Sequence, residues 1–589
     1  MTGAVLRKLL LRLREAAEKG ATADADLLLW DKVIAHPDRL SLGRQRWIEA
    51  CDDAAAVFAA RYRRTGLREF LEKAIAVYEF AAEGADATVW RDPVLLSGLA
   101  GRLRDRYSDS GRLDDLERAL DLAGQAVSET PQDAPRLAAR LNALGGMLRL
   151  KYKADGGLPH LQRAIANFRR AIATAESDPE RATFHSNLAV ALSERYERTG
   201  EPADLDSAIA EIEQAVRETP ADSPDRVTYL GNLGVFLSDR YDRTGDLSDL
   251  DSALEVIMEA VGEADADVAE TARLHSNAAI LWLDRYERTG SPLQLDMSIR
   301  SAVAAVELTP PEAAELPGYL NNLGNARRMR FEHLAEVSID AIGDSATTDI
   351  EVGDLLVAVE AYQRAIELTP AGSPHLPKFL TNLGNSLMDR GSVMASAEDL
   401  DRAVGIFDQA VTATLPGSPD LPSRLNNLAT GLRFRHSRTG LAADRRRAVE
   451  TYRDSCRLGL ESSVETALAA AQNWGLWATE RRSWAEAVEA YELALQAARQ
   501  LYRLQLSRVY KQTWLVSSDG LTAAAAFADV MVGEFAAAVV ALEGGRAMLM
   551  ADALDRDRAD LADLHAQRPL LAERYILAAE RVRSLEHLT

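Results

Sequence analysis

The sequence contains very little cysteine: Cys51 and Cys456 are the only two among 589 residues. Two cysteines are too few for a disulfide framework or a cysteine-based zinc site, and such usage is typical of a reducing compartment. No apolar run of about 18 residues occurs either, which predicts no membrane-spanning helix. Residues 5–19 interrupt their leucines with arginine and lysine and lack a cleavage site, so they predict an amphipathic capping helix rather than a signal peptide. We expect a cytoplasmic protein without a membrane partner.

Excess positive charge is also lacking, since the net charge is -22 and the isoelectric point is about 5.0. Clustered cations bind phosphate backbones, so this composition argues against nucleic acid as a partner, although a local basic stripe is compatible with the total. Lysine is scarce, and no G-x-x-x-x-G-K-[ST], H-E-x-x-H or G-x-S-x-G motif occurs. We therefore predict no catalytic residue, no cofactor and no metal site, and expect that this chain is not an enzyme.

Aromatic residues make up only 6% of the chain, and few segments show the alternation of valine, isoleucine and threonine that is typical of strands. Hydrophobic content is nevertheless 47%, with abundant alanine. Small apolar side chains at helical spacing allow helices to pack closely. The composition predicts an all-α fold.

What the sequence does contain is a repeat, of which residues 229–245, Y-L-G-N-L-G-V-F-L-S-D-R-Y-D-R-T-G, are one copy. The aromatic residue near the end of each copy recurs at spacings of 45, 45, 44, 45, 45 and 45 residues: Tyr62, Tyr107, Tyr152, Tyr196, Tyr241, Tyr286 and Phe331. A fixed period of this length indicates a solenoid. We count about ten repeats that begin at Arg44, preceded by two capping helices at residues 5–19 and 24–35.

Each repeat reads as two helices and a connector. The first helix ends at a glycine such as Gly245, which suits a left-handed C-cap. The second begins near Asp-Leu-Asp, as at residues 249–251, where carboxylates complement the positive helix end. The connector ends in Ser-Pro-Asp at residues 223–225, and Ser-Pro returns at residues 373–374 and 418–419. These dipeptides predict the N-cap and first position of the next helix.

The spacing of small and apolar residues resembles that of the tetratricopeptide repeat (TPR). In the second helix Ala208, Ile212, Ala215 and Pro220 are spaced 4, 3 and 5, and the next first helix carries Leu230, Leu233, Gly234 and Leu237. The usual unit of about 34 residues is extended here by the R-Y-x-R-T-G segment and by residues after the proline. The resemblance implies a right-handed TPR-like α-solenoid of about ten helix pairs over residues 41–500, with capping helices at 1–40.

Two segments depart from the period. Residues 332–353 form an acidic insert that we predict to be a loop at the solenoid edge, either inert or in contact with a partner. Residues 501–589 predict longer helices at 521–531, 535–554 and 570–587. Within them, residues 538–554 resemble the segment that links TPR arrays to CHAT domains, which are caspase- and separase-like cysteine proteases. That resemblance implies a CHAT-type protease in cis or in trans, whose His and Cys dyad is expected after residue 589.

The clearest candidate site is one asparagine per repeat, just before the Leu/Trp-Gly/Ala pair: Asn142, Asn187, Asn232, Asn277, Asn322, Asn382, Asn427 and Asn473. Asparagine is a mediocre residue inside a helix, so its recurrence in register requires a reason. A primary amide matches the donor and acceptor of a peptide unit, so the ladder predicts a surface that holds an extended chain, as in peptide-binding TPR proteins that it resembles. Alternatively, each asparagine bonds to the neighbouring repeat. Asp53 and Gly98 occupy the first two equivalent sites.

Other recurring residues favour structural roles. The Arg-Tyr pairs, as at residues 195–196 and 240–241, predict ring packing and local ion pairing. His185 and His275 lie two repeats apart, too far to share a metal ion. The tryptophans at positions 474, 477, 484 and 514 predict a core where the repeats end, and Cys456 predicts a buried thiol.

The sequence thus predicts a recognition module that senses a protein or peptide partner in a groove and controls a CHAT-type protease. The alternative is a stand-alone scaffold that assembles partners without a catalyst.

Overall fold

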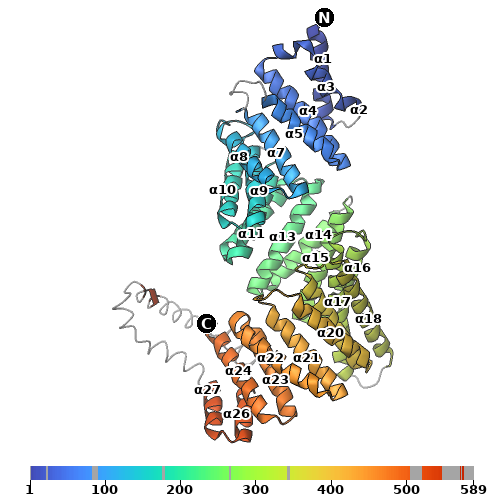
Figure 1. Ribbon diagram of the computed structural model, residues 1–589, viewed down its shortest axis with the longest axis vertical. Coiled ribbons are helices and arrows are strands. Elements are labelled where there is room, and N and C mark those ends of the chain that lie inside the picture. Colours follow the sequence, from blue (N-terminus) through green and yellow to red (C-terminus); the bar gives the residue numbers. More distant parts are fainter. Residues whose placement is uncertain are drawn as a thin grey trace. The chain divides into compact units, whose positions relative to one another are not determined.

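The computed structural model describes residues 2–20, 24–82, 91–175, 180–263, 267–340, 345–504, 520–546, and positions 571, 574, 575 and 577. The chain divides into two compact units, residues 1–281 and 282–589. All regular elements in the described residues are helical, so the predicted all-α class is confirmed (Figure 1). None of these helices is long and apolar enough to cross a membrane.

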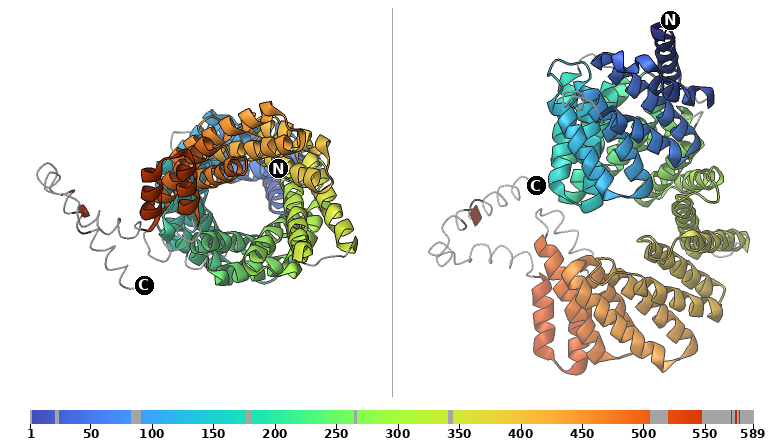
Figure 2. Two further views of the ribbon diagram at one scale, coloured as in Figure 1. Left: turned by 90° about the horizontal axis from the view of Figure 1, so that it is seen from below. Right: turned by 45° about the horizontal axis from the view of Figure 1, so that its top comes forward.

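In the described part of the chain, ten helix pairs follow the N-terminal helices. The first helices are α4 (Arg44–Thr65), α7 (Pro93–Ser110), α9 (Leu137–Asp155), α11 (Arg181–Thr199), α13 (Pro224–Thr244), α15 (Val268–Thr289), α17 (Leu316–Asp340), α19 (Leu376–Val393), α21 (Leu421–Thr439) and α23 (Val464–Glu480). Their second helices are α5 (Arg68–Ala82), α8 (Leu113–Ser128), α10 (Leu158–Thr174), α12 (Pro202–Glu218), α14 (Leu247–Glu263), α16 (Pro292–Glu307), α18 (Ser345–Leu368), α20 (Ala397–Thr412), α22 (Ala442–Ser462) and α24 (Trp484–Leu504). This is a TPR-like helical array, and within each unit successive pairs stack side by side (Figure 2).

Glycine C-caps end most of the first helices, as the sequence predicts. Gly245 has φ 69° and its N–H donates to the carbonyl of Tyr241 at 2.7 Å. The same left-handed cap closes six other first helices, at Gly66, Gly111, Gly156, Gly200, Gly290 and Gly440. Only glycine adopts this conformation without strain, so the glycine fixes where each first helix ends.

A second glycine lets the two helices of a repeat approach closely. A Cβ on Gly145, Gly384 or Gly475 would lie 2.5–2.6 Å from the ring of Phe168, Phe407 or Tyr491 on the second helix. Alanine and leucine fill the remaining interface; Leu141, Leu205 and Ala208 are all fully buried. The predicted role of small residues in close packing is confirmed.

The insert at residues 332–353 differs from its prediction. It is not a loop where the structure describes it, because α17 continues to Asp340 and α18 begins at Ser345. Both helices of the seventh repeat are therefore longer than their equivalents. Glutamate and alanine within the insert are compatible with helix, so its acidic composition does not by itself specify a loop.

The Ser-Pro prediction holds at one site and is wrong at two. Ser223 is the N-cap of α13 with proline at the first position, although its hydroxyl makes no cap bond. In contrast, Ser373 and Ser418 lie in the preceding turn, and α19 and α21 begin later, after His375 and Asp420. Each serine hydroxyl accepts a hydrogen bond at 3.3 Å from the N–H two residues on. Serine at these positions stabilises a turn, because its hydroxyl accepts hydrogen bonds from backbone N–H groups in turns as well as at helix N-caps.

The two ends of the array follow their predictions in the described part. At the N-terminus α1 (Thr2–Glu18) packs on α4, while the second predicted helix is broken into α2 (Asp24–Leu27) and α3 (Leu29–Ile34), followed by η1 (Pro37–Ser41). After α24 come α26 (Leu521–Val532) and α27 (Phe535–Arg546), which pack on each other. The predicted helix at 570–587 and the end of the 535–554 helix lie outside the described residues.

Candidate ligand-binding face

The first helix of each repeat buries one side and leaves the opposite side partly open. On α13 the open side carries Thr228, Asn232, Val235 and Asp239, whose spacings of four, three and four place them in one stripe of a helix. Thr228 and Val235 are exposed, and the other two are half-buried. We call the surface formed by these stripes the first-helix face. The asparagine ladder lies on it.

Counting back from the glycine C-cap gives the register of the ladder. Asn187, Asn232, Asn277 and Asn427 each lie thirteen residues before their glycine. Asn142, however, lies fourteen residues before Gly156, so the equivalent position in the third repeat is Ala143. The inclusion of Asn142 as a rung is therefore wrong by one position, because an extra residue separates it from the Leu-Gly pair on which the sequence was aligned.

Some ladder asparagines connect neighbouring repeats. The Nδ2 of Asn187 donates to the Oδ1 of Asn142 at 2.9 Å. Likewise Asn382 Nδ2 donates to the Oδ1 of Asn321 at 2.8 Å and to that of Asn325 at 3.2 Å. In both cases the ladder amide reaches the residue one position before the ladder site of the preceding repeat. These amides stabilise repeat stacking.

The other ladder amides are different. Four of the ladder asparagines are half-buried and make no side-chain hydrogen bond with any described residue: Asn232, Asn277, Asn427 and Asn473. Asn322 has a partner. A primary amide can donate two hydrogen bonds and accept two, so these four sites hold unused capacity on the first-helix face of each unit. The ladder therefore contains two populations that the sequence alone does not separate.

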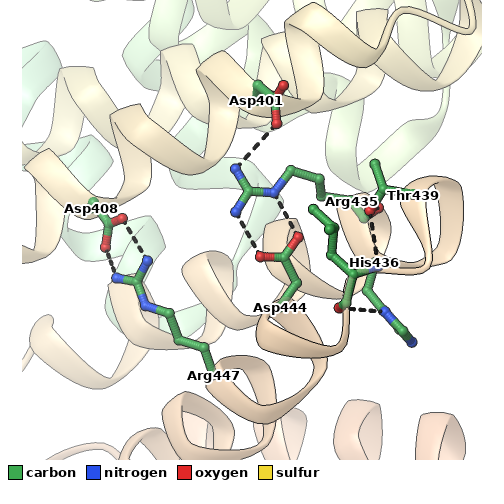
Figure 3. Close-up of polar contacts among 8 residues, drawn as sticks. Asp401, Asp408, Arg435, His436, Thr439, Asp444 and Arg447 are labelled. Carbon is green, nitrogen blue, oxygen red and sulfur yellow. Dashed lines mark hydrogen bonds and ion pairs between the residues drawn. The ribbon is translucent and has the colours of Figure 1, made fainter.

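The arginine of the Arg-Tyr pair clamps the two helices of a repeat together. Arg435 of α21 donates from Nε and Nη2 to both oxygens of Asp444 in α22, at 2.8 and 2.7 Å (Figure 3). Equivalent bidentate pairs recur in both units: Arg106–Asp115, Arg195–Asp204, Arg240–Asp249, Arg330–Asp354 and Arg390–Asp399. All six aspartates are buried. The predicted ion pairing is confirmed, and the partner aspartate is the first residue of Asp-Leu-Asp at positions 204, 249 and 399.

The same arginine also reaches an acid of the preceding repeat. Arg435 Nη1 donates to Asp401 at 3.2 Å, and Arg330 Nη1 donates to Asp296 at 2.9 Å. In the N-terminal unit, Arg106 donates to Glu72 at 2.8 Å in the same manner. Hydrogen bonds to carboxylates raise the pKa of these guanidinium groups. The conspicuous Arg-Tyr motif is thus part of the scaffold and is saturated by protein carboxylates.

Another acid on the first-helix face lacks such a partner. Glu194 and Asp389 are paired with Arg149 and Arg328 of the preceding repeat, at 3.2 and 2.9 Å. At the equivalent site, Asp239 faces a repeat that offers a serine, residue 193, in place of the arginine. Burial, followed by repulsion from residues 197 and 242, raises the pKa of Asp239 to about 6.

Two adjoining cavities hollow the first-helix face of the N-terminal unit. One, of about 480 Å³, is lined by Ala100, Arg136, Arg140 and Ala143. The other, of about 300 Å³, is lined by residues that include Ala56, Arg63, Gly98 and Arg102. Both are bounded by Ser97 and Arg136, so they form one groove across α4, α7 and α9, which we call the arginine groove. The ladder-equivalent positions Gly98 and Ala143 lie in it.

Sequence reasoning missed this groove, although a signal was present. Arg140 lies sixteen residues before its C-cap glycine, where the three following repeats carry Phe184, Tyr229 and Leu274. An arginine in place of a large apolar residue at a repeat position is a departure that alignment on the glycine would have shown.

The remaining candidates have structural contacts. Buried His185 bonds through Nδ1 to Glu211 at 2.6 Å, and burial lowers the pKa of His275. Trp474 and Trp477 are buried in the core where the repeats end, as predicted, and Trp484 packs on Phe527 of α26. Trp514 lies outside the described residues.

Both cysteines are buried, and burial raises the pKa of Cys456 to about 12. No group of three or more His, Cys, Asp or Glu suited to a metal ion occurs in the described part of the chain.

No family model matches this chain, and no curated protein does either. Among solved structures, a monomeric mutant of IFIT1 with Gppp-AAAA is 15% identical with a TM-score of 0.42, and the match covers 92% of this chain and 99% of that one. The human IFIT1 dimer with m7Gppp-AAAA is 15% identical over the same shares, with a TM-score of 0.39. BtubC from P. vanneervenii is 15% identical over 51% of this chain and 90% of its own, with a TM-score of 0.29. At these TM-scores the likeness supports no inference about a ligand.

Proposed function

We propose that this chain is a recognition module that binds an extended segment of a protein or peptide on its first-helix face and performs no chemistry itself. The observation that carries the proposal is the set of four unbonded, half-buried ladder amides at Asn232, Asn277, Asn427 and Asn473. None of these four amides is among the buried side-chain polar atoms that lack a partner in the described residues, so water reaches them, and a ligand that displaces this water must supply donors and acceptors in its place.

An extended polypeptide supplies the matching groups. Its peptide units present one donor and one acceptor at regular intervals, which is what a primary amide can pair with. Such contacts hold the backbone of the ligand and are independent of its sequence. Each bond contributes about 0.5–1.5 kcal/mol, so several amides are needed for useful affinity. The small side chain at Ala143, the ladder-equivalent position of the third repeat, permits a close approach of the ligand backbone.

A regulatory role is the finer part of this proposal. The resemblance of residues 538–554 to segments that precede CHAT domains supports control of a CHAT-type cysteine protease, attached or associated. Reconstitution of the chain with such a protease tests it: proteolysis that changes when the first-helix face is occupied supports regulation. A rate of proteolysis that does not change when the first-helix face is occupied would favour the alternative, a stand-alone scaffold that controls no catalyst.

Binding can be tested by panning displayed random peptides on the full chain and measuring the selected peptides by calorimetry. The double variant Asn232→Ala/Asn277→Ala should bind at least tenfold more weakly, because two hydrogen bonds of about 1 kcal/mol each are lost. Asn382→Ala is the matched control, since its amide is engaged with Asn321 and Asn325. Unchanged affinity in the double variant would refute the role of the ladder.

A further inference from the structure

We propose that the arginine groove binds carboxylate groups of an acidic polypeptide segment. This inference rests on the proposed function, because it assigns one region of the same ligand. It stands on the geometry of the groove, on the pairing state of its arginines and on a comparison between two repeats of this chain.

Arginines in this array are commonly held by carboxylates, but three arginines of the groove are not. Arg63 and Arg136 are exposed and make no ion pair or side-chain hydrogen bond with any described residue. Arg140 is half-buried and donates only to the hydroxyl of Thr130, at 2.9 Å, while its Nε is buried without a partner. A guanidinium has five N–H donors in a fixed fork that matches a carboxylate. The groove therefore contains guanidinium N–H donors that are positively charged and not engaged by a carboxylate of the described residues.

The acids that line the groove are fewer than its arginines. Asp52 and Glu180 are the carboxylates that line it. Asp52 accepts a hydrogen bond from the hydroxyl of Tyr78 at 2.8 Å, and Glu180 also has an interaction partner. Arg102 pairs with Asp105 at 3.0 Å. The groove carries an excess of cations within a chain of net charge -22.

The ninth repeat supplies an internal comparison. Arg424 occupies the same position as Arg140, sixteen residues before the C-cap glycine, and four residues earlier stands Asp420, which pairs with it at 3.1 Å. In the third repeat that earlier position is Arg136. A like-charge pair at this spacing destabilises a helix, whereas Asp420 and Arg424 stabilise it. Burial and the charge of Arg136 lower the pKa of Arg140. An anion bound between the two arginines would relieve this repulsion.

A polypeptide fits this surface better than a nucleic acid. Elsewhere on the first-helix face of the same unit lie Asp239 and Asp242, which form no ion pair with the described residues, and Glu197 next to them. A nucleic acid that extended from the groove along this face would bring its phosphates close to these carboxylates, and the like charges would repel. A peptide can have acidic residues in the groove and neutral residues beside these carboxylates. The alanines that line the groove, Ala100, Ala139 and Ala143, also leave room for a peptide backbone.

The test uses the full chain and a fluorescein-labelled hexaglutamate peptide, with binding followed by anisotropy at low and raised salt. The wild type should bind, and more weakly as salt increases. Arg63→Ala/Arg136→Ala should lower affinity by about tenfold or more for the loss of two charge-assisted contacts. Arg217→Ala, which removes an exposed arginine of α12, is the control and should change affinity by less than about twofold.

Arg136→Asp gives a second, sharper variant, since it recreates the arrangement of the ninth repeat. It should abolish hexaglutamate binding and raise the thermal midpoint of the chain, which loss of folding would not do. Binding that survives in Arg136→Asp, or an equal loss in Arg217→Ala, would overturn the proposal. Tighter, arginine-dependent binding of a six-nucleotide single-stranded RNA would also overturn it.

These outcomes separate the groove from the ladder. If neutral peptides bind through Asn232 and Asn277 but hexaglutamate does not bind, the proposed function stands and the groove assignment fails. If hexaglutamate binds through the arginines but asparagine substitution affects no peptide, the ladder fails and the groove remains.

Discussion

The clamp between the two helices of a repeat should be a major local source of stability, and Asp444→Asn tests it in the ninth repeat. The substitution preserves shape but replaces one carboxylate oxygen by an NH₂ group, which cannot accept from Arg435. The side chain of Asp444 is only 8% exposed, and that of Arg435 is 20% exposed. Removing one partner of a buried pair typically costs about 3–5 kcal/mol.

Two features of the site reduce that figure. Arg435 retains its contact with the exposed Asp401 at 3.2 Å, and its own partial exposure lets water solvate the freed nitrogens. We therefore expect a loss of about 2 kcal/mol. Figure 3 shows the matched control beside it: Arg447 and Asp408 form a bidentate pair of the same residue types, but their side chains are 48% and 36% exposed. Asp408→Asn should cost less than about 1 kcal/mol.

Urea denaturation followed by circular dichroism gives the free energy, and hydrogen exchange of peptides from α21 and α22 shows where the loss occurs. Because repeat arrays unfold through nearest-neighbour interactions, the increase in exchange should concentrate in the ninth repeat and its neighbours. Equal losses for Asp444→Asn and Asp408→Asn, or a loss below about 0.5 kcal/mol for the former, would refute the reasoning that burial gives the clamp its strength.

Two further predictions concern stability. Asp239 has a pKa raised to about 6, so the folded state keeps its proton at pH values where the unfolded state has released it, and the free energy of unfolding falls as pH rises from about 4 to 6. Asp239→Asn should therefore add about 1 kcal/mol to the free energy of unfolding at pH 7, after allowance for solvent screening, and nothing at pH 4. Urea titration at both pH values measures this difference. Gly234→Ala should cost about 1–3 kcal/mol because its methyl group would overlap Ile257, while Gly262→Ala, which meets open space on α14, should be neutral or stabilising in the same thermal-unfolding assay.

The predictable parts of this protein are those that depend on local sequence. Gly245 ends its helix because of a backbone conformation that one residue type adopts, and the same rule applies wherever that glycine recurs. The period, the helix pairs and the all-α class followed from such signals. The insert was mispredicted because an acidic composition is compatible with both loops and helices, and only the extension of α17 and α18 distinguishes them.

The candidate site was predicted less completely because it depends on what faces each side chain from another repeat. Asn187 and Asn232 have the same sequence context, yet only the former finds an amide across the repeat interface, because the preceding repeat carries Asn142 there. Arg136 and Arg140 are candidate ligand-binding residues for the same kind of reason, because no described carboxylate pairs with them. Sequence periodicity locates these positions, but the neighbouring repeat determines whether they are satisfied.

The most direct test of the account compares the unbonded and the bonded ladder amides in one protein. Peptide affinity by calorimetry and thermal midpoint should be measured for Asn232→Ala/Asn277→Ala and for Asn382→Ala. We predict that Asn232→Ala/Asn277→Ala loses at least tenfold in peptide affinity with little change in thermal midpoint. Asn382→Ala should lose about 1–2 kcal/mol of stability, because two hydrogen bonds are removed, and should retain its affinity for peptides bound at residues 232 and 277. A double variant that unfolds earlier but binds as tightly as the wild type would contradict the claim that this face recognises a ligand.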